Sequence, residues 1–278
     1  MTFAVTTLVG TIALAIYQLP TIAAGGLLYP GRHQFLPPIP ANCRERVFQG
    51  DRLALRGWEC RAEGRRRGTL IYLHGTADNR GSSLGVIRRY TAKGFDVVAY
   101  DSRRHGWSDG DICTYGYFEK RDLARVIDAM PQGPVVLFGT SLGAAVALQE
   151  AANDSRVAAI VAVEVFSDLE SIARYRAPRI LPEFIIQKAF EIAETKGAFR
   201  IRHVSPVEAA ESIHVPVLVI HGAADRDTPP EHSRRVFSAL RGQKRIILVE
   251  GAGHNQSLSQ PAIWSQLDKW LDERFAPD

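Results

Sequence analysis

The sequence predicts an α/β protein in which a mostly parallel sheet is covered by helices on both faces. Runs of apolar residues of strand length recur from about residue 45 onward, and segments with a helical spacing of apolar residues separate them. Strands that are apolar throughout belong to parallel sheets whose two faces are both packed. The length of 278 residues and the apolar share of 46% allow one large domain to bury such a core.

The predicted elements alternate along the chain. The first strand alternates polar and apolar residues, whereas the later strands are continuous apolar runs. The predicted strands are 52–60, 68–75, 95–101, 134–139, 157–166, 215–222 and 245–251. The predicted helices include one from about Ser82 that stops at Gly94, one that carries Leu123, Val126 and Ile127, and a last one that begins at Pro261.

A Thr-Ser pair between two glycines interrupts the apolar segment VVLFGTSLGAAVAL at residues 135–148. The first half predicts a strand and the second half a helix of small residues, with Ser141 at the sharp turn between them. Gly139 and Gly143 allow the turn to close and the helix to lie against the strand. Such a turn exposes the serine hydroxyl beside a helix N-terminus, where negative charge is stabilised. Ser141 is therefore a candidate nucleophile.

A serine nucleophile requires a base and an acid, and candidates for both follow in the chain. Asp225 comes just after the predicted strand 215–222, and His254 comes just after the strand 245–251. The order serine, aspartate, histidine, with the last two on loops after strands, predicts a catalytic triad.

The three motifs together resemble the α/β-hydrolase superfamily over residues 45–275. The resemblance is to the serine-hydrolase branch of carboxylesterases, monoacylglycerol lipases and membrane-tethered thioesterases. The acid loop of that branch reads HGxxD and its base loop reads GxGH, as HGAAD at 221–225 and GAGH at 251–254 do here. The resemblance implies an eight-stranded, mostly parallel sheet with a small helical cap.

The resemblance also assigns roles to single residues. It favours Asp225 over Asp227 as the acid, and it implies that the backbone N–H groups of Thr76 and Leu142 form an oxyanion hole. Nearby polar residues are interpreted as structural: His74 and His221 are expected to bond loop backbone. Asp101 and His105 are expected to hold the loop that follows the strand 95–101.

The segment 167–214 is longer than a single crossover requires, and we interpret it as a cap over the site. Its aromatic residues lie among arginines and prolines. They either select a substrate or only pack helices onto the sheet, and the sequence is compatible with both.

Composition excludes several classes of function. The net charge of +4 is small and no basic stripe with interleaved aromatic residues occurs, so nucleic-acid binding is not expected. The eight histidines show no metal-ligand spacing, so neither a metal nor an organic cofactor is expected. The widely spaced Cys43, Cys60 and Cys113 indicate no disulfide framework.

Residues 1–28 form an apolar segment, and no charged residue precedes Arg32. The segment is compatible with a membrane anchor, a cleaved signal peptide, or an arm packed on the domain. Residues 29–44 are then a proline-rich linker to a hydrolase domain at 45–278. Because positive residues follow the segment, an anchor places this domain on the cytoplasmic side, with periplasmic, secreted and cytoplasmic locations as alternatives.

The sequence therefore predicts a hydrolase of small-molecule carboxylic esters that works through an acyl-enzyme. Ser141 attacks the ester, His254 transfers the protons, and Asp225 orients the imidazole. The alternatives are an acyl-thioesterase of the depalmitoylase kind, a serine peptidase, and a catalytically silent binding module. Since the predicted site lies after residue 45, deletion of residues 1–28 is expected to leave it active.

Overall fold

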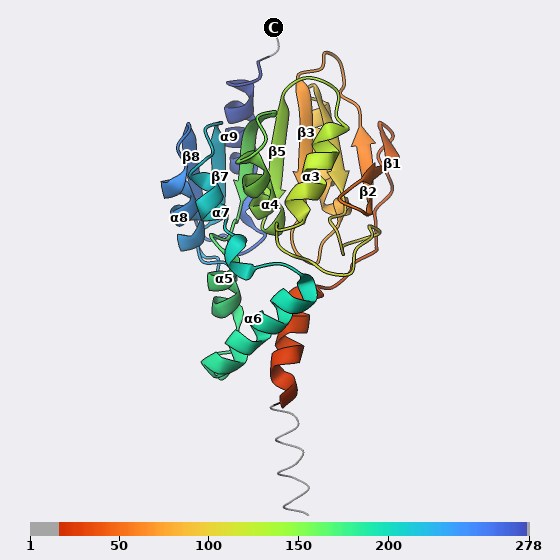
Figure 1. Ribbon diagram of the computed structural model, residues 1–278. Helices are drawn as coiled ribbons and strands as arrows, with labels where there is room; N and C mark the ends of the chain where they lie inside the picture. The colour runs from red at the N-terminus through yellow and green to blue at the C-terminus, as the bar shows by residue number, and fades with distance from the viewer. Residues whose placement is uncertain (1–16, 277–278) are drawn as a thin grey trace, which may run out of the picture.

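The computed structural model describes residues 17–276, which contain one eight-stranded sheet (Figure 1). Its strand order is β1-β2-β4-β3-β5-β6-β7-β8. β1 pairs antiparallel with β2 and β2 with β4, while all other neighbours are parallel. The strands are β1 (Cys43–Gln49), β2 (Ala54–Cys60), β3 (Gly68–Leu73), β4 (Phe95–Tyr100), β5 (Val135–Thr140), β6 (Val157–Val163), β7 (Val217–Gly222) and β8 (Lys244–Val249). The predicted fold class is confirmed.

Helices cover both faces of the sheet. α3 and α4 pack on one face, and α2 and α9 pack on the other. The α-helices are α2 (Leu84–Thr91), α3 (Glu119–Asp128), α4 (Leu142–Ala151), α5 (Leu169–Arg176), α6 (Glu183–Gly197), α7 (Pro206–Ala210), α8 (Glu231–Ala239) and α9 (Pro261–Asp272). Short 3-10 turns are η1 (Arg80–Ser83), η2 (Ile201–His203) and η3 (Ser257–Ser259).

The central strands show why continuous apolar runs predicted a covered sheet. Every residue of β3 is buried. Leu70 and Tyr72 point into the core beneath α2 and α9, whereas Ile71 and Leu73 point into the core beneath α3 and α4. Successive side chains of a strand face opposite sides, so a strand in the middle of this sheet has no polar face.

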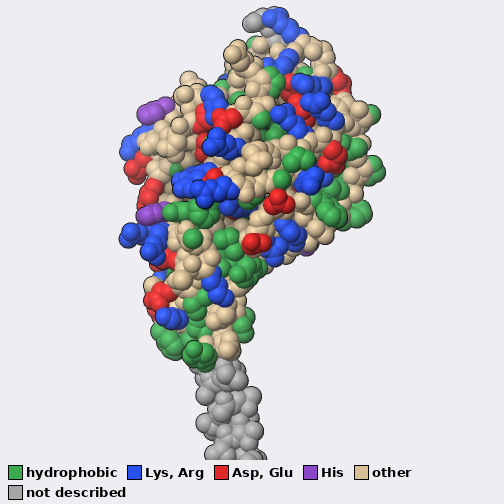
Figure 2. Space-filling model, turned by 45° about the vertical axis from the view of Figure 1, so that its right-hand side comes forward, with side chains coloured by type: hydrophobic (Ala, Val, Ile, Leu, Met, Phe, Trp, Pro, Cys, Tyr) green, Lys and Arg blue, Asp and Glu red, His purple; other side chains and the backbone are tan. Residues whose placement is uncertain are grey.

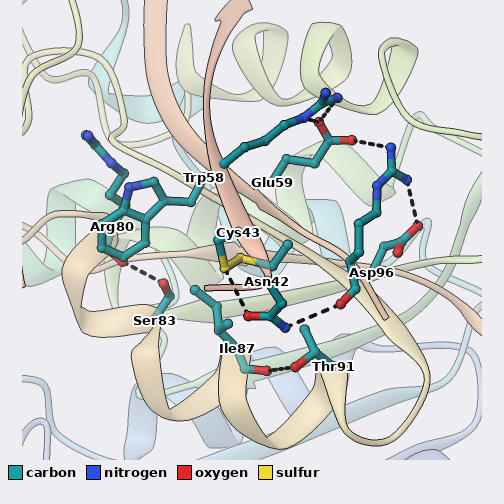
Figure 3. The surroundings of a disulfide bond; sticks show 12 residues. Asn42, Cys43, Trp58, Glu59, Arg80, Ser83, Ile87, Thr91 and Asp96 are labelled. Carbon is teal, nitrogen blue, oxygen red and sulfur yellow. Dashed lines mark hydrogen bonds and ion pairs between the residues drawn. A yellow bond between two sulfur atoms is a disulfide. The ribbon is translucent and has the colours of Figure 1, made fainter. Parts of the chain in front are cut away.

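A disulfide joins the two strands at one edge of the sheet. The register of β1 and β2 places Cys43 opposite Cys60, and their sulfur atoms are bonded (Figure 3). This corrects the expectation drawn from the cysteine spacing. The two residues are 17 positions apart in the sequence, and only the pairing of the strands brings them together. β1 itself was not predicted, because it is a largely polar edge strand, and it starts inside the predicted linker.

Residues 17–28 are helical and are called here the N-terminal helix. Ala24 and Leu28 are fully buried in the same core cluster as residues of α6. The carbonyl of Leu28 accepts a hydrogen bond from the backbone of Cys113 at 2.9 Å, and the carbonyl of Leu27 accepts one from the Tyr115 hydroxyl at 3.1 Å. This part of the predicted apolar segment is therefore packed on the domain.

A membrane-spanning helix was one of the interpretations of the apolar segment. Within the part of the chain that the structure describes, no helix combines the length and the apolar character needed to cross a bilayer. Residues 1–16, which make up more than half of the predicted anchor, lie outside the described residues.

The chain between the N-terminal helix and β1, residues 29–42, runs along the body and is called here the strap. Asn79 Nδ2 donates hydrogen bonds to the carbonyls of His33 at 2.9 Å and Phe35 at 3.0 Å. The Trp107 indole donates to the carbonyl of Gln34 at 2.9 Å. The predicted linker is thus held by side chains of the domain.

α5 and α6 extend away from the sheet beside the N-terminal helix, and together they form the cap (Figure 1). α7 belongs to the predicted cap segment, but it packs on α4 and α8 in the body. Large apolar side chains are exposed at the free end of the cap and the N-terminal helix, which Figure 2 shows as hydrophobic surface next to the residues that are not described. These side chains are Tyr17, Ile22, Ile180 and Phe184.

Candidate active site

Ser141 occupies the turn between β5 and α4, as the sequence predicted. Its backbone has φ of 48° and ψ of −110°, a conformation that a residue with a side chain rarely adopts. The turn is held because Ser141 N donates to the carbonyl of Val163 at 2.8 Å, while its own carbonyl accepts from Ala145 N at 3.1 Å. The strain is typical of a nucleophile elbow.

The two glycines of the motif are required by close packing. A Cβ on Gly139 would lie 2.4 Å from the backbone nitrogen of Ala144, and a Cβ on Gly143 would lie 2.1 Å from the carbonyl oxygen of Leu73. Neither contact is possible for a larger residue. The start of α4 therefore lies directly against β5 and β3, which fixes the position of Ser141 at the carboxyl end of the sheet.

Asp225 and His254 form a hydrogen-bonded pair. His254 Nδ1 lies 2.7 Å from Asp225 Oδ2, while the other carboxylate oxygen accepts backbone N–H bonds from Asp227 and Thr228, each at 2.9 Å. Burial opposes ionisation of Asp225, but the hydrogen bonds from His221 and His254 outweigh it and lower its pKa. Asp225 is therefore an anion that orients the imidazole.

The pKa of His254 is raised. Burial by itself favours the neutral imidazole, but the hydrogen bond to Asp225 and the charges of Asp225, Glu164 and Asp227 together favour the cation more strongly. Asp227 contributes from the opposite edge of the ring, since its Oδ2 lies 3.6 Å from His254 Nε2. It makes no contact with Nδ1, the nitrogen that Asp225 holds.

Glu164 is a residue of the site that sequence reasoning missed. It is buried and has a positive φ of 54°, and its Oε2 lies 3.6 Å from His254 Nδ1. Its carboxylate accepts hydrogen bonds from the backbone of Asn255 at 2.5 Å and from the Ser257 hydroxyl at 2.5 Å. Glu164 thus anchors the loop that carries His254. The available signal was a single carboxylate inside the apolar run 157–166.

His221 holds the loop that carries Asp225. Its Nδ1 pairs with the Ser233 hydroxyl at 2.6 Å, while its Nε2 donates to the carbonyl of Thr228 at 2.8 Å and also lies 3.3 Å from Asp225 Oδ2. The structural interpretation of this histidine is confirmed.

His74 determines the direction of a backbone donor. Its Nδ1 bonds the carbonyl of Gly75 at 2.7 Å, and its Nε2 accepts from Ser102 N at 2.9 Å. The carbonyl of Gly75 and the N–H of Thr76 belong to one planar peptide and point in opposite directions. The bond from His74 therefore fixes the Thr76 N–H, and this peptide lies beside Ser141, since a Cβ placed on Gly75 would be 3.6 Å from the Cβ of Ser141.

Leu142 is the first residue of α4. The N–H groups of a helix's first turn have no partner within the helix, so the N–H of Leu142 is free to bind an oxygen beside Ser141.

The loop with Asp101 and His105 supports the His74 side of the site. Asp101 accepts hydrogen bonds from the backbone of Arg80 and Trp107, and His105 packs edge-on against His74. Both residues are buried structural groups, as expected.

Ser141 and His254 line the same cavity, together with Thr76 and Glu164. Among the described residues, no hydrogen bond joins the Ser141 hydroxyl to His254. Hydrogen bonds between catalytic groups are often long before a substrate is bound. The structure therefore brings Ser141, Thr76 and His254 to one cavity, with Asp225 hydrogen-bonded to the far side of the His254 ring.

Glu164, Asp225 and His254 present ligand atoms within 4.8 Å of one another, which is close enough to hold a metal ion. However, His254 Nδ1 is bonded to Asp225, and Glu164 accepts hydrogen bonds from the loop of Asn255 and Ser257. Each candidate ligand already has a partner within the protein, so the arrangement favours proton transfer over metal binding.

The cap reaches the site through Arg176 on α5. Its guanidinium bonds Asp227 Oδ2 at 2.7 Å and the Thr228 hydroxyl at 2.8 Å. The neighbouring Tyr175 hydroxyl donates to the carbonyl of Arg226 at 3.1 Å. The cap is thus attached to the loop that carries Asp225, which the sequence alone did not indicate.

Comparison with known proteins places this geometry in context. The chain matches the family model of the α/β hydrolase fold over residues 68–199 and that of TAP-like proteins over residues 198–278. It is 31% identical over 202 residues to the uncharacterized protein YqkD of Bacillus subtilis, an alignment that covers 69% of this chain and 66% of that protein. It is 26% identical to human protein ABHD12B, covering 74% of this chain and 61% of that protein. The chain spans about two thirds of these relatives.

Solved structures share the fold. An esterase of Pyrococcus furiosus superposes with a TM-score of 0.72 at 20% identity, covering 88% of this chain and all, 100%, of that one. The acylaminoacyl peptidase of Pyrococcus horikoshii superposes with a TM-score of 0.66 at 16% identity, covering 84% of this chain and 41% of that one. At these identities the likeness concerns the fold and does not identify the substrate.

Proposed function

The chain belongs to the α/β-hydrolase superfamily, and from this premise we propose that it hydrolyses carboxylic esters through an acyl-enzyme formed on Ser141. The observation that carries the proposal is the strained position of Ser141 at the β5–α4 turn, in one cavity with a histidine whose Nδ1 is held by a buried carboxylate. Backbone strain of this kind costs free energy, and strained residues cluster at functional sites.

The proposed reaction has two halves. In the first, His254 Nε2 takes the proton of Ser141 as its oxygen attacks the ester carbonyl, and the Thr76 and Leu142 N–H groups stabilise the resulting oxyanion. The proton then passes to the leaving alcohol as the C–O bond breaks. In the second half, water attacks the acyl-enzyme by the same route in reverse, which releases the acid and restores Ser141.

A fluorophosphonate probe tests this proposal directly, because it modifies only an activated serine. We expect mass spectrometry to find the label on Ser141 and to find none in a Ser141→Ala variant. Hydrolysis of p-nitrophenyl acetate should be lost in the same variant. An unlabelled wild-type protein that is folded by circular dichroism and releases no p-nitrophenol would instead favour a silent binding module.

We also propose that the domain works in an oxidising compartment. The Cys43–Cys60 disulfide carries this proposal, since disulfides persist outside the reducing cytosol. It favours a periplasmic or secreted location over the predicted cytoplasmic side. Protein that is alkylated at the moment of cell lysis should show both thiols protected. Complete alkylation of Cys43 and Cys60 would contradict this proposal and favour a cytoplasmic location of the domain.

A further inference from the structure

Two cavities of different character meet at Ser141. One has a volume of about 480 Å³ and the other about 540 Å³, both within the range of small-molecule sites. Thr76, Ala77, Ser141 and Arg176 line both of them. An ester bound at Ser141 can therefore extend into both cavities, one on each side of its carbonyl carbon.

The first cavity, called here the apolar cavity, is enclosed by the N-terminal helix and the cap. Ala23 and Leu27 come from the N-terminal helix, Ile172 from α5, and Ile186 and Phe190 from α6. The polar groups among its walls lie near Ser141 or already have partners, as the Tyr115 hydroxyl does in its bond to Leu27. Its walls therefore offer mainly apolar contact.

The second cavity, called here the polar cavity, is lined by carboxylates. Asp78, Glu164 and Asp227 contribute to its walls, against the single guanidinium of Arg176, which is itself paired with Asp227. His254 also lines this cavity and does not line the apolar one. The polar cavity thus has an excess of negative charge beside the general base.

The chemistry of the acyl-enzyme decides which part of the substrate enters which cavity. When the C–O bond breaks, the leaving oxygen takes the proton from His254 Nε2, so the alcohol must lie on the side of His254. The alcohol therefore occupies the polar cavity. The acyl chain, attached to the other side of the carbonyl carbon, extends into the apolar cavity.

On the basis of the proposed ester hydrolysis, we propose that the substrates are esters between an extended apolar acyl chain and an uncharged, hydroxyl-bearing alcohol. Hydroxyl groups can donate to the carboxylates of the polar cavity. A phosphate-bearing alcohol is repelled by the same carboxylates, because like charges brought together in a partly buried site destabilise binding. Coenzyme A thioesters are excluded by the same argument, since their leaving group carries phosphates.

The alcohol side is tested with two substrates that share one acyl chain, 1-octanoylglycerol and 1-octanoylglycerol 3-phosphate. We expect kcat/KM to be at least about tenfold higher for the neutral substrate at low salt. Asp78→Asn keeps an acceptor for the Asn79 N–H but removes the negative charge. This variant should lower the ratio of kcat/KM for the neutral substrate to kcat/KM for the phosphate. Equal rates for the two substrates, or faster hydrolysis of the phosphate, would overturn the proposal.

The acyl side is tested with p-nitrophenyl esters from acetate to dodecanoate. For the wild-type protein kcat/KM should rise about fourfold per added methylene until the apolar cavity is filled. Gly26 lines this cavity, and a Cβ placed on it meets no atom within 4 Å, so Gly26→Trp fills the cavity from the N-terminal helix. This variant should lower the dodecanoate-to-acetate ratio at least about tenfold.

Gly25→Trp is the matched control, because Gly25 is the adjacent residue of the same helix and does not line the cavity. Gly25→Trp should keep the wild-type ratio of kcat/KM for dodecanoate to kcat/KM for acetate. If Gly26→Trp does not fold, Ala173→Trp fills the cavity from α5 instead. If the protein reacts with fluorophosphonate but its kcat/KM does not change with acyl chain length, the assignment of the cavities is refuted and the proposed reaction is not. Absence of both labelling and hydrolysis would refute the proposed reaction as well.

Discussion

The Nδ1 atom of His254 lies 2.7 Å from Oδ2 of Asp225, whereas Asp227 approaches only the opposite nitrogen of the ring, at 3.6 Å. The two aspartates therefore have different effects on the imidazole. Asp225 fixes its tautomer and orientation, and Asp227 contributes charge from the solvent side.

The first prediction separates these two carboxylates. Asp225→Asn should lower kcat about 10⁴-fold, because an amide at this position stabilises the wrong tautomer of the histidine. Asp227→Asn should lower it less than about tenfold. Steady-state rates on p-nitrophenyl acetate compare the two isosteric variants, and a reversed ranking would make Asp227 the catalytic acid.

The second prediction concerns Ser141 and His254 as one unit. Ser141→Ala and His254→Ala should each lower kcat by about 10⁴-fold or more, and the double variant should lose little beyond either single one. The reason is that removal of either group ends the same proton-coupled attack. Independent losses that multiply in the double variant would show that the two side chains do not share a mechanism.

The third prediction concerns pH. His254 must be neutral to accept the serine proton, and its pKa is raised, so activity should increase with pH and reach half its maximum above pH 6.5, the ordinary imidazole value. Glu164→Gln removes one of the negative charges that stabilise the cation. It should therefore move the midpoint of the kcat/KM profile to lower pH.

Asp227→Asn provides the comparison for this pH effect, because it removes a charge from the other side of the ring without altering the anchor of the His254 loop. The midpoint of the kcat/KM profile of Asp227→Asn should also move to lower pH. A midpoint that rises in either variant would contradict the assignment of the profile to His254.

The fourth prediction concerns the N-terminal helix. Leu28 is completely buried, so Leu28→Ala should lower the free energy of unfolding by about 3 kcal/mol, as truncations of buried leucines do. Ile22 lies on the same helix and is 66% exposed, and Ile22→Ala should cost less than about 0.5 kcal/mol. Urea denaturation measures both. Equal effects would mean that the helix does not dock on the cap in solution.

That the site stays active after deletion of residues 1–28 remains a prediction, and these contacts add that the deletion should lower the stability of the domain. Truncation removes Ala23 and Leu27 from the apolar cavity and Leu28 from the core. Ser141, Asp225 and His254 lie outside the deleted segment, whereas one wall of the apolar cavity lies within it.

The fifth prediction concerns the disulfide. Its loop spans 17 residues, and replacement of both cysteines by alanine should lower the free energy of unfolding by about 3 kcal/mol. Dithiothreitol should lower the melting temperature of the wild-type protein and leave that of the Cys43→Ala/Cys60→Ala variant unchanged. A wild-type melting temperature that does not respond to the reductant would mean that the bond is not formed.

The strands β2 to β8 and the positions of Ser141, Asp225 and His254 could be predicted because each depends on local sequence, whereas the polar edge strand β1 could not. Buried strands are apolar runs, and the nucleophile requires Gly139 and Gly143 within a few residues. The contribution of Glu164 could not be predicted, because it depends on how the loop after β8 folds back over β6. The Cys43–Cys60 bond depends in the same way on strand pairing, and the docking of Leu28 depends on the position of α6.

The strap connects the N-terminal helix to the loop that carries Thr76. It is bound through Asn79, which follows shortly after Thr76 on the loop between β3 and η1, and through Trp107. A displacement of the helix that pulls on the strap should therefore also disturb this loop. The N-terminal helix and the loop that carries Thr76 are in this way joined by hydrogen bonds as well as through the sheet.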